Sequence, residues 1–168
     1  RSQESTHKQN NEILLVGPGT IGIEYCNILT ELNYKPIVVG RGKKSAKNFE
    51  NETGISVHLH GIEYWLESSK NIPDYAIISV TGSNLGNVTK QLILSGVKNI
   101  LVEKPGGTNF DEIQEVADLA HQKDSNVLIA YNRRFYASVM RAKELIQADG
   151  GVKSFYFEFT EWSHVIED

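Results

Sequence analysis

The sequence lacks most of the features that mark secreted, membrane and nucleic-acid-binding proteins. Its 168 residues include a single cysteine, Cys26, so no internal disulfide can form and a reducing compartment is expected. No apolar run reaches the roughly 18 residues that a membrane-spanning helix needs, and residues 1–12 are polar, without a signal-peptide pattern. The formal charge of -4 favours neither nucleic acid nor an anionic membrane as a partner. We therefore expect a cytoplasmic protein that binds neither membranes nor nucleic acids.

Ligand clusters for a metal ion are also missing. His58 and His60 form an H-x-H pair, but no cluster of cysteines or carboxylates lies around them with the spacing of metal ligands. The sequence therefore predicts no metal site.

What the sequence does contain is a glycine motif in the context typical of dinucleotide binding. Residues 13–16 are apolar and predict a buried strand, the glycines follow in the spacing G-x-G-x-x-G, and a helical pattern begins directly afterwards. The first glycine allows a tight turn, the second lets the backbone approach a pyrophosphate, and the third lets the helix pack on the strand. The N–H groups of the first helical turn favour phosphate. The predicted phosphate-binding residues are Gly17, Gly19, Thr20, Ile21 and Gly22.

Apolar segments and helical patterns alternate along the rest of the chain. Segments of strand length occur at residues 36–40, 57–59, 75–80, 99–102 and 126–130, with helical spacing between them. Strands that alternate with helices predict an α/β fold, here a doubly wound parallel sheet of Rossmann type.

The two ends of the chain depart from this alternation. Residues 1–12 carry almost no apolar side chain and predict a flexible leader or linker. Between residues 152 and 162, Phe155, Phe157 and Phe159 alternate with polar or amphipathic residues, which is typical of a strand with one buried face. We therefore expect a leader at 1–12, a dinucleotide-binding domain at 13–150, and the start of a truncated C-terminal α+β domain at 151–168.

The end of the second predicted strand bears on the choice of dinucleotide. An enzyme for NAD usually carries Asp or Glu there, but this chain has Arg41 followed by Lys43, Lys44 and Ser45, and no carboxylate until Glu50. A guanidinium can stack on adenine and pair with a 2′-phosphate through two N–H groups. We therefore predict NADP as the cofactor, with NAD as the second choice; a solvated basic loop without a ligand is the alternative interpretation.

Polar residues also follow the later strands, where ligands of doubly wound sheets bind. Lys104 ends the fifth strand between Glu103 and Pro105, and partial burial there would lower the pKa of its ammonium and suit it to proton transfer. We predict Lys104 as a catalytic residue. The further predicted cofactor-binding residues are Thr81, Gly82 and Asn84 after the fourth strand, Glu103 and Lys104 after the fifth, and Asn132 and Arg133 after the sixth. For the segment 81–84, a plain turn is an equal alternative.

The glycine turn, the E-K-P at residues 103–105 and the Y-N-R-R-F at residues 131–135 together resemble the Gfo/Idh/MocA oxidoreductases, over about residues 12–162. This resemblance implies hydride transfer between a nicotinamide and a sugar, polyol or sugar nucleotide, with Lys104 beside the nicotinamide and the reacting hydroxyl. The chain departs from the family in two places. Residues 81–87 lack the Pro and His that members often carry there, and the catalytic Asp/His pair of the family's second domain does not occur.

Two functions follow from these observations. One is the cofactor-binding domain of an NAD(P)-dependent oxidoreductase acting on a sugar, polyol or sugar nucleotide. The other is a dinucleotide-binding or regulatory module that keeps the fold without turnover. The expected partners are a sugar-like small molecule and either a second copy of the chain or a C-terminal domain.

Overall fold

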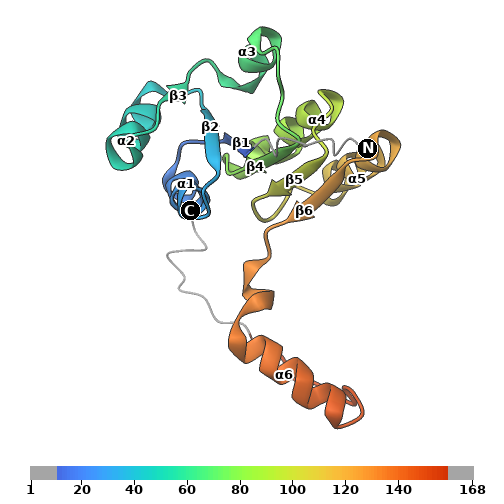
Figure 1. Cartoon of the computed structure of the whole chain (residues 1–168). Coiled ribbons are helices and arrows are strands. Elements are labelled where there is room, and N and C mark those ends of the chain that lie inside the picture. Colours follow the sequence, from blue (N-terminus) through green and yellow to red (C-terminus); the bar gives the residue numbers. More distant parts are fainter. Residues whose placement is uncertain (1–10, 159–168) are drawn as a thin grey trace, which may run out of the picture. The chain divides into compact units, whose positions relative to one another are not determined.

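Six parallel strands form one sheet in the order β3-β2-β1-β4-β5-β6 (Figure 1). The computed structural model describes residues 11–158 of the chain. The direction of winding reverses between β1 and β4, which is the topological switch point where ligands of such sheets bind. The predicted doubly wound parallel sheet is confirmed. The strands are β1 (Glu12–Val16), β2 (Lys35–Val39), β3 (Val57–His58), β4 (Tyr75–Ile78), β5 (Asn99–Val102) and β6 (Asn126–Ile129).

The register of the central strands places their carboxyl ends at one edge of the sheet. Val16, the last residue of β1, pairs with Val39 of β2 and with Ile78 of β4. Ile78 in turn pairs with Val102, the last residue of β5. The loops that follow β1, β2, β4 and β5 therefore start level with one another, and the residues in them can line one site.

Helices connect the strands close to the expected positions. They are α1 (Thr20–Glu31), α2 (Lys43–Thr53), α3 (Gly61–Ser68), α4 (Leu85–Leu94), α5 (Phe110–Lys123) and α6 (Ala137–Ala148). Two short 3-10 helices, η1 (Gly82–Asn84) and η2 (Asn132–Phe135), follow β4 and β6. The N-cap of α5 is Asn109, whose side chain accepts a hydrogen bond from the Glu112 N–H at 2.9 Å, as its residue type predicts.

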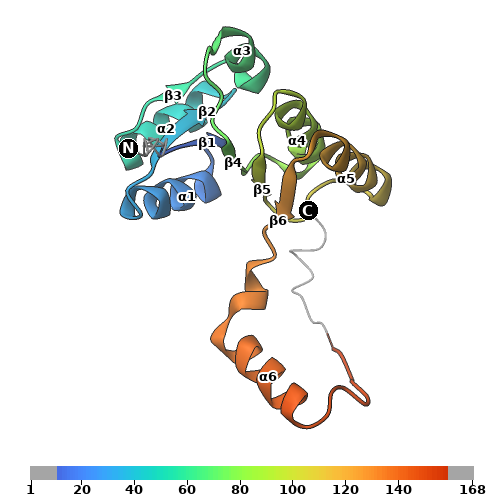
Figure 2. The ribbon, with the colours of Figure 1, turned by 45° about the vertical axis from the view of Figure 1, so that its right-hand side comes forward.

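Two apolar clusters hold helices on opposite faces of the sheet (Figure 2). On one face, Leu15 and Val38 pack with Cys26 of α1 and Phe49 of α2. Cys26 is buried and is thus a small core residue. On the other face, the strands pack against α3, α4 and α5 through residues such as Leu92. Burial on both faces explains why the central strands are continuous apolar runs.

The chain divides into two compact units, with the boundary between Tyr131 and Asn132. The sequence places the end of the dinucleotide-binding domain later, at residue 150. The difference is α6: its helical pattern resembles that of the preceding helices, but it buries none of its residues and belongs to the second unit. Periodicity predicts a helix, and only packing decides which unit the helix joins.

The predicted strand at 152–162 is wrong for the residues that the structure describes. Residues 152–158 form no strand, and Phe155, Tyr156 and Phe157 are each exposed. A strand needs backbone partners on a neighbouring strand, and the described part of the second unit supplies none. Residues 1–10, which include most of the predicted leader, and residues 159–168 lie outside the described range.

Within the described range, every helix is too short or too polar to cross a membrane. The same residues hold no group of three or more His, Cys, Asp and Glu side chains that could ligate a metal ion.

Candidate functional site

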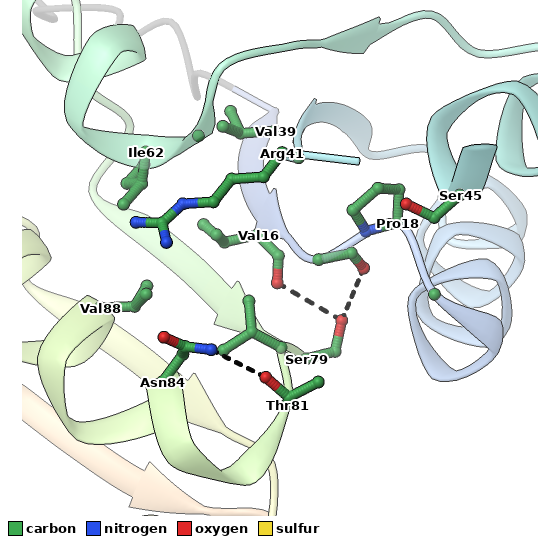
Figure 3. A pocket seen from close by; sticks show the side chains of 15 residues that line it. Val16, Pro18, Val39, Arg41, Ser45, Ile62, Ser79, Thr81, Asn84 and Val88 are labelled. Carbon is green, nitrogen blue, oxygen red and sulfur yellow. Dashed lines mark hydrogen bonds between the residues drawn. The ribbon is translucent and has the colours of Figure 1, made fainter. Parts of the chain in front are cut away.

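A pocket of about 320 Å³ lies at the switch point between β1 and β4, at the carboxyl edge of the sheet. Its walls come from the turn after β1, the ends of β2 and β4, and the first turns of α3 and α4 (Figure 3). Of the predicted cofactor-binding residues, Gly17, Gly19, Arg41, Ser45, Thr81 and Asn84 line it. Predicted residues from three separate connections, after β1, β2 and β4, therefore converge on one cavity.

The three glycines of the turn differ in what surrounds them. Gly17 has a φ of +112°, and a Cβ on it would lie 2.6 Å from the carbonyl oxygen of Ser79. A Cβ on Gly22 would overlap the carbonyl oxygen of Gly17. Around Gly19, by contrast, no atom of the described chain comes within 4 Å of such a Cβ. Protein packing therefore explains two of the glycines, and the space at Gly19 is open to a ligand.

Contacts from neighbouring strands fix the glycine turn. The Ser79 hydroxyl donates to the Gly17 carbonyl at 2.9 Å, and the Gly17 N–H donates to the Val39 carbonyl at 3.0 Å (Figure 3). Pro18 packs against Gly40, where a Cβ would lie 2.5 Å from its Cγ. Sequence reasoning missed Pro18, Gly40 and Ser79. The strand register could have found Ser79, because it directly follows the residue that pairs with the last residue of β1.

The first turn of α1 provides unpaired backbone donors at the turn. The helix has Gly19 at its N-cap, no side chain caps it, and its first turn contains no acidic residue. The first N–H groups of a helix have no partner inside the helix, and the helix dipole favours an anion there. Thr20 and Ile21 are exposed in this turn but do not line the pocket. Their side chains face solvent, so only their backbone suits the predicted role.

At the end of β2, Arg41 lines the pocket but is already paired. Its Nη2 donates to Oε1 of Glu63 at 2.6 Å. The sequence has no carboxylate between Arg41 and Glu50, but the fold brings one to Arg41 from farther along the chain. Glu50, the nearest candidate in the sequence, instead accepts a hydrogen bond from the Val57 N–H at 2.8 Å. Glu63 was missed because it is 22 residues away, and only the pairing of β3 with β2 brings the start of α3 to Arg41.

The basic residues that follow Arg41 do not gather around it. Lys43 and Lys44 are exposed in the first turn of α2 and do not line the pocket. Ser45 does line the pocket, and its hydroxyl donates to the Gly42 carbonyl at 3.0 Å. In Figure 3 the Arg41 side chain extends toward Ile62, away from Ser45. The structure thus separates Arg41 from the other predicted donors.

After β4, two of the three predicted residues reach the pocket. Thr81 and Asn84 line it, and the Asn84 amide donates to the Thr81 hydroxyl at 2.8 Å (Figure 3). Gly82 begins η1, is exposed and does not line the pocket.

Lys104 lies at the same edge of the sheet, after β5, but outside the lining of this pocket. It is exposed, so the predicted partial burial is wrong for this structure. Glu103 is half-buried and accepts a hydrogen bond from the Tyr25 hydroxyl at 2.6 Å. Burial and the Glu103 carboxylate both raise the pKa of Tyr25, which therefore stays protonated and keeps donating. Hydrogen bonds of Glu103 hold this turn in place, whereas the Lys104 side chain is exposed to solvent.

Asn132 and Arg133 belong to η2, in the second unit. Their cofactor-binding role stays a prediction.

A dinucleotide fits the residues of this site. The open space at Gly19, the uncapped first turn of α1 and the polar pair Thr81 and Asn84 are the parts that such a ligand uses. The apolar side chains of Val39 and Ile62 in the same wall suit the flat face of a base.

Comparison with known proteins agrees with this geometry. Residues 12–131 match the model of the GFO_IDH_MocA family, described as an oxidoreductase family with an NAD-binding Rossmann fold. A search of proteins with curated functions finds no significant match.

Several solved structures share the fold at low sequence identity. The WlbA dehydrogenase of Chromobacterium violaceum, in complex with NADH and UDP-GlcNAcA, is 16% identical with a TM-score of 0.70 over 82% of this chain and 40% of its own. GenD2 from gentamicin A biosynthesis, in complex with NAD, is 20% identical with a TM-score of 0.71 over 85% and 40%. The myo-inositol 2-dehydrogenase of Lactobacillus plantarum is 18% identical with a TM-score of 0.69 over 83% and 41%. This chain therefore spans about two-fifths of the length of these relatives.

Proposed function

Because the chain belongs to the Gfo/Idh/MocA family of oxidoreductases, with an NAD-binding Rossmann fold, we propose that it is the cofactor-binding domain of an NAD(P)-dependent enzyme. The reaction is hydride transfer to or from a sugar, polyol or sugar nucleotide. The proposal for the substrate rests on relatives whose names include a UDP-sugar ligand or myo-inositol. Those proteins are more than twice as long as the matched part, and the substrate class is part of the proposal.

The observation that carries the proposal is the difference between Gly19 and its two neighbouring glycines. Gly17 and Gly22 are required by contacts within the protein, whereas nothing in the described chain explains a glycine at position 19. A pyrophosphate beside the first turn of α1 explains it, because the phosphate oxygens would occupy the space of a Cβ and accept hydrogen bonds from the free N–H groups.

For the cofactor we propose NADP first and NAD second. Arg41 lines the pocket at the end of β2, with Ser45 on the same wall and Lys43 and Lys44 in the first turn of α2. A guanidinium in the pocket wall and two ammonium groups exposed in the first turn of α2 are the groups that favour a 2′-phosphate.

Lys104 is the residue that we propose for the chemistry. A bound nicotinamide supplies the hydride acceptor or donor. In reduction, the Lys104 ammonium would give a proton from Nζ to the oxygen of the reacting carbon; in oxidation, its neutral amine would take the hydroxyl proton at Nζ. The turn that carries Lys104 is anchored by Glu103, whose N–H donates to the Ile78 carbonyl at 2.9 Å and whose carboxylate is held by Tyr25.

A non-catalytic dinucleotide-binding or regulatory module is the second candidate. The exposure of Lys104, and its place outside the pocket lining, favour it. Turnover of sugars, polyols and sugar nucleotides by the full-length protein, with Lys104→Ala as the variant, separates the two. We expect the variant to lose at least about a hundredfold in rate, as general acid–base groups do. No turnover by the wild type, with dinucleotide binding intact, would support the module instead.

We further propose a cytoplasmic location and association with a second copy or with a C-terminal domain. The single cysteine is free and buried, which suits a reducing compartment. Gel filtration of the purified protein tests the association, and a monomer with no bound domain would exclude it.

A further inference from the structure

The ion pair between Arg41 and Glu63 connects two walls of the pocket. Arg41 follows β2, and Glu63 lies in the first turn of α3. Their Nη2 and Oε1 atoms are 2.6 Å apart, a short charge-assisted hydrogen bond. Gly61 permits this approach, since a Cβ on it would lie 2.8 Å from Nε of Arg41. The Arg41 side chain thus lies across the start of α3.

A third residue fixes the carboxylate of this pair. The Gln91 amide on α4 donates to the same Oε1 of Glu63 at 3.1 Å. Its other end, Oε1 of Gln91, is buried without a hydrogen-bond partner in the described chain. A flipped amide would face the carboxylate with an oxygen, so the observed orientation is the favourable one. Two side chains therefore hold the Glu63 carboxylate, and its position does not depend on Arg41 alone.

The charge on Glu63 is stable at neutral pH. Burial alone would raise the pKa of its carboxyl, but its own backbone N–H, the Gln91 amide and Arg41 outweigh burial and lower it. A full negative charge therefore lies beside the one arginine that lines the pocket in the described structure.

We propose that Glu63 is a positioning residue that sets the cofactor preference: it holds Arg41 toward α3, away from Ser45 and the start of α2, so the site accepts NAD and discriminates only weakly in favour of NADP. This inference rests on the proposed dinucleotide binding. No residue of the glycine turn enters the argument, so the two can fail separately.

The physical reason is competition for one guanidinium. A 2′-phosphate at the start of α2 must draw Arg41 from Glu63, or share it, and it must also approach an uncompensated carboxylate. NAD has hydroxyls at that place and meets neither penalty. The pyrophosphate is common to both cofactors, so any effect of Glu63 on it enters both affinities and cancels from their ratio. The ratio therefore reports the effect of Glu63 on the 2′-phosphate.

The test is the ratio of NADPH to NADH affinity in wild type and Glu63→Gln, measured by nicotinamide fluorescence. Glutamine keeps an acceptor for Arg41 and Gln91 but removes the charge. We expect NADPH to bind about threefold to fivefold tighter and NADH to change less than about twofold, because a partly exposed ion pair contributes at most about a fivefold change in affinity. Glu67→Gln, which removes a charge from the same helix one turn later, is the matched control and should leave the ratio unchanged.

The variant Arg41→Ala completes a double-mutant cycle. It should weaken NADPH binding more than NADH binding. The effect of Glu63→Gln on NADPH affinity should be smaller in the Arg41→Ala background, because no guanidinium remains for Glu63 and the 2′-phosphate to compete for. Wild type that binds either dinucleotide, with a ratio unmoved by Glu63→Gln, overturns this inference alone. A wild type that binds neither overturns the proposed function.

Discussion

The two ends of the candidate site are built differently. At the glycine turn, from Val16 to Gly22, contacts from the end of β2 and from Ser79 after β4 set the backbone, and the space beside Gly19 is the part left open. At the Lys104 turn, Tyr25 and the β4 backbone hold Glu103, but the lysine itself is exposed and lies outside the pocket lining. The described chain thus completes the proposed binding end of the site and exposes Lys104, the proposed catalytic end, to solvent. Binding and chemistry should therefore respond to different substitutions.

Gly17→Ala should have the largest effect, on folding and on binding together. Its Cβ would meet the Ser79 backbone at 2.6 Å at a φ of +112°, so the free energy of unfolding should fall by about 3 kcal/mol or more. Urea denaturation measures it. Gly54→Ala, which also has a positive φ but open space around it, should lose only about 1 kcal/mol. Equal losses in the two variants would mean that the Ser79 contact contributes nothing.

Gly19→Ala should affect binding alone. The residue is extended, with φ -88° and ψ -173°, and its Cβ meets no atom of the described chain. The free energy of unfolding should stay within about 0.5 kcal/mol of wild type. NADPH and NADH affinity should fall by about tenfold to a hundredfold, the range of an overpacked contact. A stable variant with wild-type affinity would show that the pyrophosphate does not bind beside this turn.

Lys104→Ala should leave both folding and dinucleotide affinity nearly unchanged. The side chain is exposed and outside the pocket lining, so affinity should change less than about twofold and stability less than about 0.5 kcal/mol. Lys70→Ala, another exposed lysine, is the control for the lost charge. A large loss of NADH or NADPH affinity specific to Lys104 would show that the two ends of the site are not separable.

The smallest expected effect is on the folding stability at acid pH, and it concerns a residue outside both the glycine turn and the Lys104 turn. The Thr108 backbone N–H and hydroxyl, at 2.6 and 2.9 Å, lower the pKa of the Glu112 carboxyl, with a further contribution from Lys90. Because the pKa of Glu112 is lower in the folded state, its ionised carboxylate stabilises the fold at pH values above the ordinary pKa of 4.5. This stabilisation is lost progressively as the pH falls below that value. Wild type should therefore be more stable than Glu112→Gln at pH 7, and the difference should shrink toward pH 3. A pH-independent difference would exclude this cause.

The sequence predicts those parts of the molecule that depend on local pattern. The apolar segment before Gly17, the glycine spacing and the periodicity of α1 are local, and the structure confirms them. Ser79 and Glu63 could not be found in this way, because the strand register and the pairing of β3 with β2 bring them to the site. The alternating aromatics around Phe155 show the reverse case: their pattern suits a strand, but a strand also needs a neighbour.

Burial is the other property that the sequence did not determine. Lys104 follows an apolar strand, which led to the expectation of a partly buried ammonium, yet the residue is exposed. A strand end is positioned by its own ladder, whereas the burial of the next side chain depends on what covers the edge of the sheet.

Fluorescence titration of NADPH and NADH into the wild-type chain and Gly19→Ala tests the central claim most directly. The account predicts saturable binding of at least one dinucleotide to wild type, with a Kd below about 1 mM, and binding at least about tenfold weaker in a variant of unchanged stability. No saturable binding by wild type, or equal binding by the two proteins, would contradict it.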